Sequence, residues 1–435
     1  MKTANHCLLN LLCLPYISAN KSMINLKDLY ICAILNSLIL VNYFFLTFNF
    51  RILEVIFILF IFIAIIFYTT YSCKEKFISK LLILIIFIIS IGTPLNDWDG
   101  KYIWLFHAKR IFYENSVYAQ LDDYMPWTHN DYPILVPSLS ASIASFFHIW
   151  NDNIPKLSSA IMLCPMIIFI NSIIKNNITK IIFFSFFLWI TEKILLSGSV
   201  DDLLTSYTLC SSLIIYFLFF EKKYFFYNKK ILLFLSYTFI TLTTLIKNEG
   251  LVIIIILFLS AFFIKKIILK ETIDKKIYLI FALSLIPILF WKYKCYSAGI
   301  YSDIINIENV KNIKDRYLDL RNYWNIFNYM TLNKSLLLPI LLFFVIEFQK
   351  IKIVKAKKKF ILIKMELKEK NYLLYMIFFA IFYYLTIFFI YLSTPNDLIW
   401  HLSTSAYRVV MPIGVMLIFY TMVKLDHNKL SSKVL

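Results

Sequence analysis

The stretch FISKLLILIIFIISIGTPLNDWDG, residues 77–100, joins a long apolar run to a pair of aspartates. Lys80 is the one charged residue between 77 and 95. A helix of that length, rising about 1.5 Å per residue, matches a hydrocarbon layer about 30 Å thick. Asp97 and Asp99 follow directly and flank a tryptophan. The stretch therefore predicts a helix that crosses a membrane and ends in an acidic loop at the membrane surface.

Similar apolar blocks recur along the chain. Of the 435 residues, 60% are hydrophobic and 16% are charged, and the mean hydropathy is +0.73, whereas a soluble domain is about half apolar. We therefore expect an all-α, polytopic membrane protein whose transmembrane domain, residues 28–435, has about twelve spanning helices. The expected spans lie near residues 28–49, 52–72, 77–95, 155–174, 179–197, 202–220, 231–247, 250–269, 277–295, 333–348, 371–393 and 407–424.

The N-terminal segment, residues 1–27, does not form a span of this kind. Its apolar part is too short, and it lacks a clean signal-peptide cleavage pattern. We expect either a segment that lies on the membrane surface or a true start at Met23.

The formal net charge of +18 comes from short basic clusters between the apolar blocks. This distribution is typical of the positive-inside rule, by which basic loops stay in the cytoplasm. No basic arm with interleaved aromatic residues is present, so nucleic acid is not an expected partner. The seven cysteines are scattered and form no CxxC pair, which argues against a disulfide framework or a zinc site.

One further apolar stretch is YPILVPSLSASIASFFHIW at 132–150. The charge of the loops indicates whether it crosses the membrane. If it does not cross, the loops placed in the cytoplasm carry net charges from +2 to +7, and the first outer segment, 96–131, carries −3. If it did cross, the strongly basic run at 349–370 would have to be exported. We therefore expect an interfacial or re-entrant helix at 132–150, within an outer loop that covers 96–154.

This topology places every acidic loop that adjoins an apolar helix on the same outer face. Ionisable groups near the hydrocarbon are costly, ~2.5–3.5 kcal/mol each at a helix centre, and often mark a functional site. We therefore expect one outward-facing polar cavity. The segments concerned are NDWDG (96–100), THNDYP (128–133), GSVDD (198–202), IKNEG (246–250) and PNDLIWHLSTSAYR (395–408).

Each carboxylate also has a simpler explanation. Asp97 or Asp99 could cap the following helix, but capping accounts for one aspartate, and the other would be free to act as a general base. Asp201 and Asp202 likewise begin an apolar block, where one aspartate suffices as a cap. Asp131 lies in a loop before a proline, where a solvated surface role is equally open.

The basic residues of the outer loops have alternatives of the same kind. Lys247 and Glu249 could form a self-neutralising pair in a surface turn, or Lys247 could bind an anion. Arg408 is not needed for orientation on the outer side, and a phosphate contact would explain it. His129 and His401 are either solvated loop residues or further ligands of the cavity.

The motifs together resemble the GT-C superfamily of integral membrane glycosyltransferases. The similarity is to the branch of dolichyl-phosphate-mannose protein mannosyltransferases and bacterial lipid A aminoarabinose transferases. In that superfamily the first outer loop carries an acidic motif, which Asp97-Trp98-Asp99 matches. Further similar patches are DGKYIWLFHAKRIF (99–112), DYPILVPSLSASIASFFHIW (131–150), GSVDDLLTSYTLCSSLIIYFLF (198–219), TLIKNEGLVIII (244–255) and WHLSTSAYRVVMPI (400–413).

The resemblance implies transfer of a sugar from a polyprenyl-phosphate-linked donor to a hydroxyl of a glycan, lipid or protein acceptor. It places the cavity on the periplasmic face of a bacterial inner membrane, with membrane lipids as further partners. Asp99 is the expected base, with Asp97 as the alternative, and Arg408 and Lys247 are expected to hold the phosphate. The other candidate substrate-binding residues are Asp201, Asp202, Glu249, His401, His129 and Asp131.

Several questions stay open on the sequence alone. Asp201 and Asp202 could hold the acceptor, orient the base, or bind a divalent cation such as Mg²⁺ or Mn²⁺. A polysaccharide ligase or polymerase would use a similar lipid-linked glycan, and Arg316 and Arg321 in the 296–332 loop suit it. A multi-pass transporter would place its site near the membrane midplane, often between internal repeats, and no repeat is found.

Overall fold

The computed structural model of the chain describes residues 26–48, 51–70, 76–119, 121, 124–174, 176–192, 195–220, 229–301, 309–356 and 367–432. Within these ranges all regular structure is helical. The expected N-terminal segment, residues 1–27, lies outside them except for its last two residues, and most of the basic run at 349–370 also lies outside or has no described side chains.

Most of the helices are apolar along their whole length. In chain order they are α2 (Leu26–Thr47), α3 (Arg51–Thr70), α4 (Phe77–Gly92), η2 (Gly100–Trp104), α5 (Leu105–Glu114), η3 (Pro126–Thr128), α6 (Leu135–Phe147), α7 (Leu157–Ile173), α8 (Asn177–Thr191), α9 (Asp201–Phe220), α10 (Lys229–Ile246), α11 (Asn248–Phe262), η4 (Phe263–Ile268), α12 (Lys275–Ser297), α13 (Asn309–Tyr317), α14 (Leu320–Thr331), α15 (Lys334–Ala356), α16 (Leu367–Ser393), α17 (Leu398–Val409) and α18 (Met411–Ser432).

The chain is a multi-pass membrane protein by the length and composition of these helices. The described residues contain eight helices that are long and apolar enough to cross a membrane, or nine if α14 and the start of α15, bent by 70°, form one span. The count of twelve is not confirmed, because the other three expected spans fall on α4, α7 and α8. These helices have 16, 17 and 15 residues, and at about 1.5 Å per residue each is shorter than a hydrocarbon layer of about 30 Å.

The helix α9 is the centre of the bundle. Every residue of α9 except Leu218 is buried, and the helix packs against α7, α10, α11, α16 and α18. Burial of apolar side chains around α9 therefore holds together helices from both halves of the chain. The first residue of α9, Asp201, is fixed in place by this packing.

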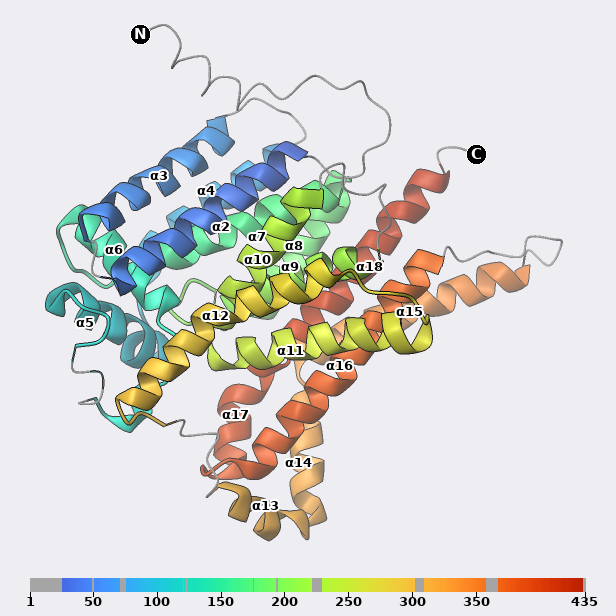
Figure 1. The fold of residues 1–435 in the computed structure, drawn as a ribbon. Helices are drawn as coiled ribbons and strands as arrows, with labels where there is room; N and C mark the ends of the chain where they lie inside the picture. Colours follow the sequence, from blue (N-terminus) through green and yellow to red (C-terminus); the bar gives the residue numbers. More distant parts are fainter. Residues whose placement is uncertain are drawn as a thin grey trace, which may run out of the picture.

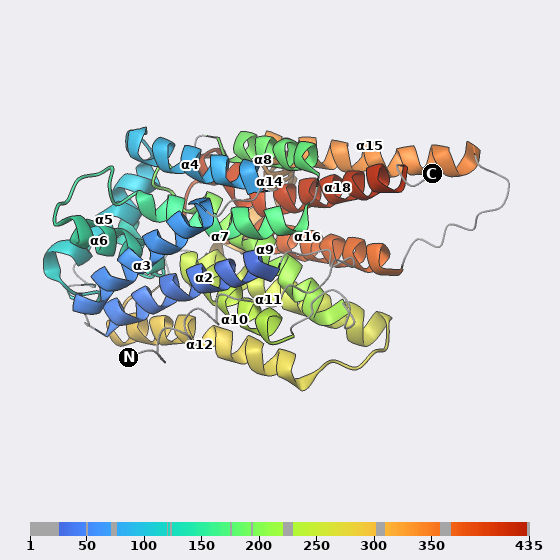
Figure 2. The same cartoon turned by 90° about the horizontal axis from the view of Figure 1, so that it is seen from above.

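The acidic loops gather at one end of the bundle. Figure 1 shows α5, α13, α14 and α17 at this end, which we call the acidic-loop end, whereas the C-terminal ends of α15 and α18 lie at the opposite end. Figure 2, a view from above, places α5 and the end of α15 far apart in the same way. The acidic loops that charge predicts to share one side thus lie at one end of the bundle.

The stretch at 132–150 forms α6, a helix of 13 residues. At about 20 Å it is shorter than a hydrocarbon layer of about 30 Å, and whether it crosses stays a prediction from charge. An interfacial helix would leave one face exposed, but residues 135–144 are all buried, and α6 packs against α2, α3, α5 and α7. The helix α6 is therefore packed into the bundle rather than lying on its surface.

The stretch at 395–408 is not an outer loop that precedes the last span. Residues 398–409 form α17, and the side chain of Asp397 caps the helix by accepting a hydrogen bond from the backbone N–H of Trp400, 2.8 Å away. With α18 it makes one candidate span, Leu398–Leu425. Arg408 therefore lies inside a helix that begins ten residues earlier, rather than at the start of a span.

Candidate functional site

Two glycines bring the first acidic loop against the loop before α9. A Cβ atom added to Gly100 would lie 2.9 Å from the carbonyl oxygen of Ser197. Gly198 has a φ of +99°, a conformation that side chains other than glycine's rarely adopt, and a Cβ there would lie 2.8 Å from Cδ1 of Leu95. This close backbone approach places Asp97 and Asp99 beside the first turn of α9.

The two aspartates of this loop have different local roles. The Asp97 carboxylate accepts a hydrogen bond from the backbone N–H of Gly100, 2.9 Å away, as a helix-capping residue does. Asp99 makes no capping hydrogen bond and directly precedes a stretch of π-helix, Gly100–Trp104. Short π-helical segments are frequent at functional sites. Capping therefore accounts for Asp97 and leaves the Asp99 side chain free to face elsewhere.

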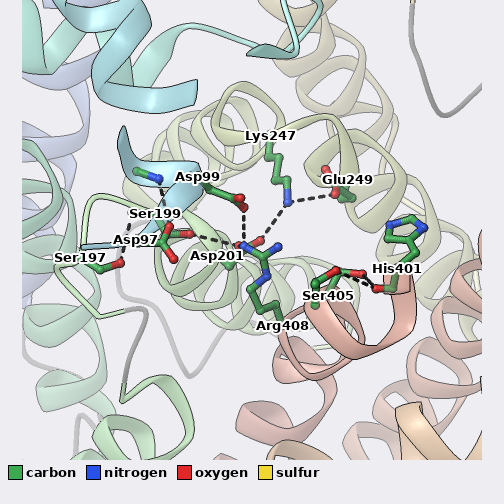
Figure 3. A network of polar contacts seen from close by, with 12 residues as sticks. Asp97, Asp99, Ser197, Ser199, Asp201, Lys247, Glu249, His401, Ser405 and Arg408 are labelled. Carbon is green, nitrogen blue, oxygen red and sulfur yellow. Dashed lines mark hydrogen bonds and ion pairs between the residues drawn. The ribbon is translucent and has the colours of Figure 1, made fainter. Parts of the chain in front are cut away.

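Asp99 faces Arg408, with which it forms an ion pair (Figure 3). The same guanidinium nitrogen, Nη1, lies 3.4 Å from a carboxylate oxygen of Asp201. The other oxygen of Asp201 accepts a hydrogen bond from Nζ of Lys247 at 3.0 Å, and Lys247 also pairs with Glu249 at 3.1 Å. Five predicted site residues from four separate segments thus form one continuous chain of charges, which we call the charge network.

A break between two helices sets Lys247 in this network. The helix α10 ends at Ile246 and α11 begins at Asn248, while Lys247 itself is extended, with φ −158° and ψ 158°. Its side chain is 9% exposed and that of Asp201 is 5% exposed. Because a buried charge is costly unless it is paired, each member of the network depends on its partners.

The network lines a cavity of about 960 Å³ at the acidic-loop end. Three tryptophans that are each more than half exposed, Trp98, Trp127 and Trp400, form part of its wall. The cavity combines charged groups with large apolar ring faces. Eight of the ten residues predicted for the site line it: Asp97, Asp99, His129, Asp201, Lys247, Glu249, His401 and Arg408.

The two histidines at the cavity belong to its polar and aromatic wall. The ring of His129 stacks on Tyr132, with centroids 4.7 Å apart. His401 shares a hydrogen bond with the hydroxyl of Thr394 through Nδ1 at 2.8 Å, and its ring lies edge-on to Tyr391. Tyr391 in turn hydrogen-bonds Ser405 at 2.7 Å. These contacts orient the α16–α17 side of the cavity.

Asp202 does not line the cavity. Successive residues of an α-helix point about 100° apart, so Asp201 and Asp202 face different directions. Asp201 faces the cavity, whereas the side chain of Asp202 is fully buried in the bundle. The prediction that Asp202 binds substrate is therefore not supported by its position.

Asp131 also lies behind the cavity wall rather than in it. Its carboxylate accepts a hydrogen bond from the side-chain amide of Asn248 at 2.6 Å. Its carbonyl oxygen accepts hydrogen bonds from Trp291 and Lys292, at 3.1 and 3.0 Å, and Lys292 donates a further one to Asn248 at 2.7 Å. Asp131 was predicted to bind substrate, but the geometry makes it a support for the helix break at Lys247.

Sequence reasoning missed Lys292 and the three tryptophans. Lys292 lies within an apolar block, where a charged residue is itself a signal of a function or a specific partner. Trp98 and Trp400 lie in segments that were singled out for their acids and histidines, and Trp127 directly precedes another such segment. Their exposure to a cavity is a tertiary property, so composition could not identify them.

Burial changes the acidity of one carboxylate outside the spanning helices. Desolvation raises the pKa of Asp97 above its usual value, against the opposing effect of its hydrogen bond from Gly100. Asp97 therefore holds a proton more readily than an exposed aspartate. A group of this kind can exchange protons with a bound ligand, which keeps Asp97 as the alternative base.

The residues of the cavity do not have the arrangement of a preformed metal centre. Within the described ranges, no group of three or more histidine, cysteine, aspartate or glutamate side chains is placed to hold a metal ion. Two of the cavity carboxylates, those of Asp99 and Asp201, are engaged by Arg408 and Lys247. The donor set thus does not fit the divalent cation that the sequence left open.

Comparisons of the chain with protein-family models, with curated proteins and with solved structures found no match.

Proposed function

We propose that the chain is a membrane glycosyltransferase that moves a sugar from a polyprenyl-phosphate-linked donor to a hydroxyl acceptor. The observation that carries the proposal is the contact between Asp99 and Arg408, which are 309 residues apart in the sequence. This contact unites a candidate base with a candidate phosphate ligand in one cavity. Two groups predicted separately to act on the same reaction thus lie where they can do so together.

The chemistry requires both groups. The acceptor hydroxyl attacks the anomeric carbon and passes its proton to a carboxylate, here Asp99, acting as general base. The bond from the anomeric carbon to the phosphate oxygen breaks, and the lipid phosphate leaves with one more negative charge. Arg408 and Lys247 provide fixed positive charges for that leaving group, which lowers the barrier without protonating it.

The cavity also suits the substrate in size and lining. At about 960 Å³ it lies near the upper end of the range of small-molecule sites, about 300–1,000 Å³. Trp98, Trp127 and Trp400 offer flat apolar faces on which the rings of a sugar can rest, while the carboxylates accept hydrogen bonds from its hydroxyls. A purely apolar lipid pocket would need no such carboxylates.

The place of the cavity in the fold suits a lipid-linked donor. Asp201 and Lys247 lie at the first turn of α9 and at the break before α11, both of which are candidate spans. The end of a spanning helix is the level at which a lipid phosphate lies. A donor of this class could therefore keep its chain in the bilayer while its phosphate and sugar enter the cavity.

Transfer can be tested in proteoliposomes that contain a panel of polyprenyl-phosphate-linked sugars and extracted envelope glycans as acceptors. Mass spectrometry would follow release of the polyprenyl phosphate. We expect release with the wild-type protein and a loss of at least about 100-fold with Asp99→Asn. Asp152→Asn is the matched control, because Asp152 is an exposed aspartate of the same outer loop that does not line the cavity. Release that persists in both Asp99→Asn and Asp97→Asn would contradict the proposed base.

A further inference from the structure

Arg408 is shared between two carboxylates in a cavity that holds more acid than base. Among the described residues, four carboxylates line the cavity, those of Asp97, Asp99, Asp201 and Glu249, against two permanent cations, Lys247 and Arg408. A phosphate that enters this space adds negative charge to a site that is already acidic. Since both cations are already paired with carboxylates, we treat its binding as an exchange of partners rather than a simple addition.

The two carboxylates on Arg408 are not equally replaceable. Asp201 is buried at the start of α9 and is held further by Lys247 at 3.0 Å and by the hydroxyl of Ser199 at 3.2 Å. Asp99 is 19% exposed, and among the described residues Arg408 is the one hydrogen-bond or ion-pair partner of its side chain. Asp99 is therefore the partner that an incoming anion can displace.

One N–H donor of Arg408, at Nε, is available for such an anion. Both carboxylates approach the same nitrogen, Nη1, while the buried Nε of Arg408 has no hydrogen-bond partner among the described residues. A guanidinium binds phosphate best with two parallel N–H groups. A turn of the guanidinium that presents Nε together with a terminal nitrogen to the phosphate would satisfy the buried donor, form the stronger pairing and draw Nη1 away from Asp99.

We infer that the donor phosphate and Asp99 compete for Arg408, so that donor binding releases Asp99 to act as the base; this rests on the proposed function. While it is paired with Arg408, the Asp99 carboxylate oxygen that faces the guanidinium is not available to an acceptor hydroxyl. After the exchange, phosphate oxygens occupy Arg408 and the carboxylate is free. Asp201 continues to hold Arg408 and Lys247 in place.

The transfer step then balances. The acceptor oxygen forms a bond to the anomeric carbon, and its proton goes to the freed Asp99 carboxylate. The bond between the anomeric carbon and the phosphate oxygen breaks, and its electron pair stays on the phosphate, which remains on Arg408. An acceptor that enters first meets a sequestered base, so proton transfer from its hydroxyl waits until the donor phosphate has bound. The product phosphate must leave before Asp99 pairs with Arg408 again.

The exchange makes an unusual prediction about affinity. Binding of undecaprenyl phosphate to the full-length protein in nanodiscs would be measured for the wild-type protein and three variants. Asp99→Asn removes the competitor, so we expect binding tighter by about tenfold, that is about 1.4 kcal/mol, whereas Arg408→Gln should weaken it by at least as much. Asp97→Asn is the matched control, since it removes the same charge from the same cavity without touching Arg408, and we expect a change of about twofold or less.

The outcomes separate the exchange from the function on which it rests. Lipid phosphate binding that Arg408→Gln weakens, but that Asp99→Asn leaves unchanged or weakens, overturns the exchange and leaves the proposed function standing. Equal tightening by Asp97→Asn and Asp99→Asn assigns the effect to net charge and also overturns it. If neither the wild-type protein nor any variant binds the lipid phosphate, both proposals fail.

Two control measurements accompany the binding experiment. Inorganic phosphate run in parallel distinguishes a lipid headgroup from a free anion, and tightening that appears with inorganic phosphate alone contradicts the lipid source. Size-exclusion profiles check that each variant is folded. If Asp99→Asn does not fold, Asp99→Ser replaces it, and if Arg408→Gln does not fold, Arg408→Lys replaces it. The lysine keeps the charge but loses the paired N–H groups, so Arg408→Lys should still bind the lipid phosphate more weakly than the wild-type protein.

Discussion

Asp97 and Asp99 show how neighbouring residues of one type acquire separate functions. Asp97 caps the helix turn through Gly100, and Asp99 pairs with Arg408. Sequence alone allowed either aspartate to cap, and the backbone geometry decides between them. The residue that does not cap is the one available for chemistry.

This division predicts different effects of the same substitution on stability and on transfer. Asparagine is as good a cap as aspartate, so Asp97→Asn should keep the loop intact and reduce transfer by no more than about tenfold. Asp97→Ala removes the cap and should lower stability by about 1 kcal/mol. Apparent melting temperatures and transfer rates of both variants would test this, and a melting temperature that is equal in the two would contradict the cap.

A buried histidine behind the cavity gives a pH dependence of stability. Burial lowers the pKa of His107 to about 4, and its Nε2–H donates a hydrogen bond to the carbonyl oxygen of Thr128, 2.9 Å away. In the unfolded chain a histidine takes up a proton near pH 6.5. The neutral side chain thus contributes fully to stability above about pH 6.5, and that contribution is lost as the pH falls toward 4.

At pH 5 this loss should be on the order of 2 kcal/mol. The apparent melting temperature of the wild-type protein should therefore fall between pH 7.5 and pH 5, and it should fall less in His107→Gln. His148→Asn is the control, because His148 is exposed and asparagine tolerates its positive φ of 54°. Equal pH sensitivity in His107→Gln and the wild-type protein would count against this assignment.

At the scale of elements, the site depends on contacts between loops and helix ends. The approach of Gly100 and Gly198 joins the acidic loop to α9. The hydrogen bonds of Asp131 and Lys292 hold the break between α10 and α11. Neither contact involves a cavity charge directly, yet both decide where the charges of Asp99 and Lys247 lie.

The glycine contact can be tested by adding one methyl group. Gly100→Ala would place a Cβ within 2.9 Å of the Ser197 carbonyl oxygen, so the two loops must move apart. We expect at least about a tenfold loss of transfer, because misplacement of a reacting group by about 1 Å is costly. Gly92→Ala is the control, as a Cβ at Gly92 meets no atom within 4 Å. Comparable losses in the two variants would show that the contact does not position the site.

The helix break can be tested through Lys292. Lys292→Met removes the donor to Asn248 and to the Asp131 carbonyl while it keeps an apolar stem. Since Lys247 is expected to contact the donor, KM for the donor should rise about three- to tenfold with little change in kcat. Lys294→Met is the matched control on the same helix, where Lys294 lies over the rings of Tyr118 and Phe290. A fall in kcat alone would argue against a positioning role.

At the scale of the whole molecule, the fold separates an acidic-loop end from an opposite end, where the described parts of α15 and α18 end. Figure 1 shows this separation along the bundle. The basic clusters at 265–276 and 349–370 predict that the opposite end is cytoplasmic. The proposed function requires this orientation, because the lipid-linked donor presents its sugar on the outer face.

Reporter fusions test both the orientation and the number of spans. A fusion after residue 120 should report the outside, and one after residue 360 the cytoplasm. Fusions after residues 175 and 198 test the short helices α4, α7 and α8, and if all three cross they should report the cytoplasm and the outside, respectively. The reverse pattern at 120 and 360 would overturn the orientation, and the same side at 175 and 198 would show that α8 does not cross.

The sequence by itself determined the helices and the set of charged residues that lie at the acidic-loop end. Hydrophobicity is a local property that adds up along a segment, so residues such as those of 77–95 indicate a helix without knowledge of their neighbours. Charge differences between loops are equally local, and they predicted that 132–150 does not span. For these features no long-range contact needs to be known.

The tertiary structure alone decided which charges meet. Asp99 reaches Arg408 across 309 residues, Asp201 rather than Asp202 faces the cavity, and Asp131 turns toward Lys292. Each outcome depends on the rotation and axial position of whole helices, which the packing around α9 and the approach of two glycine backbones set. A shift of one residue along a helix turns a side chain by about 100°, and that geometry converts a list of acids and bases into one charge network.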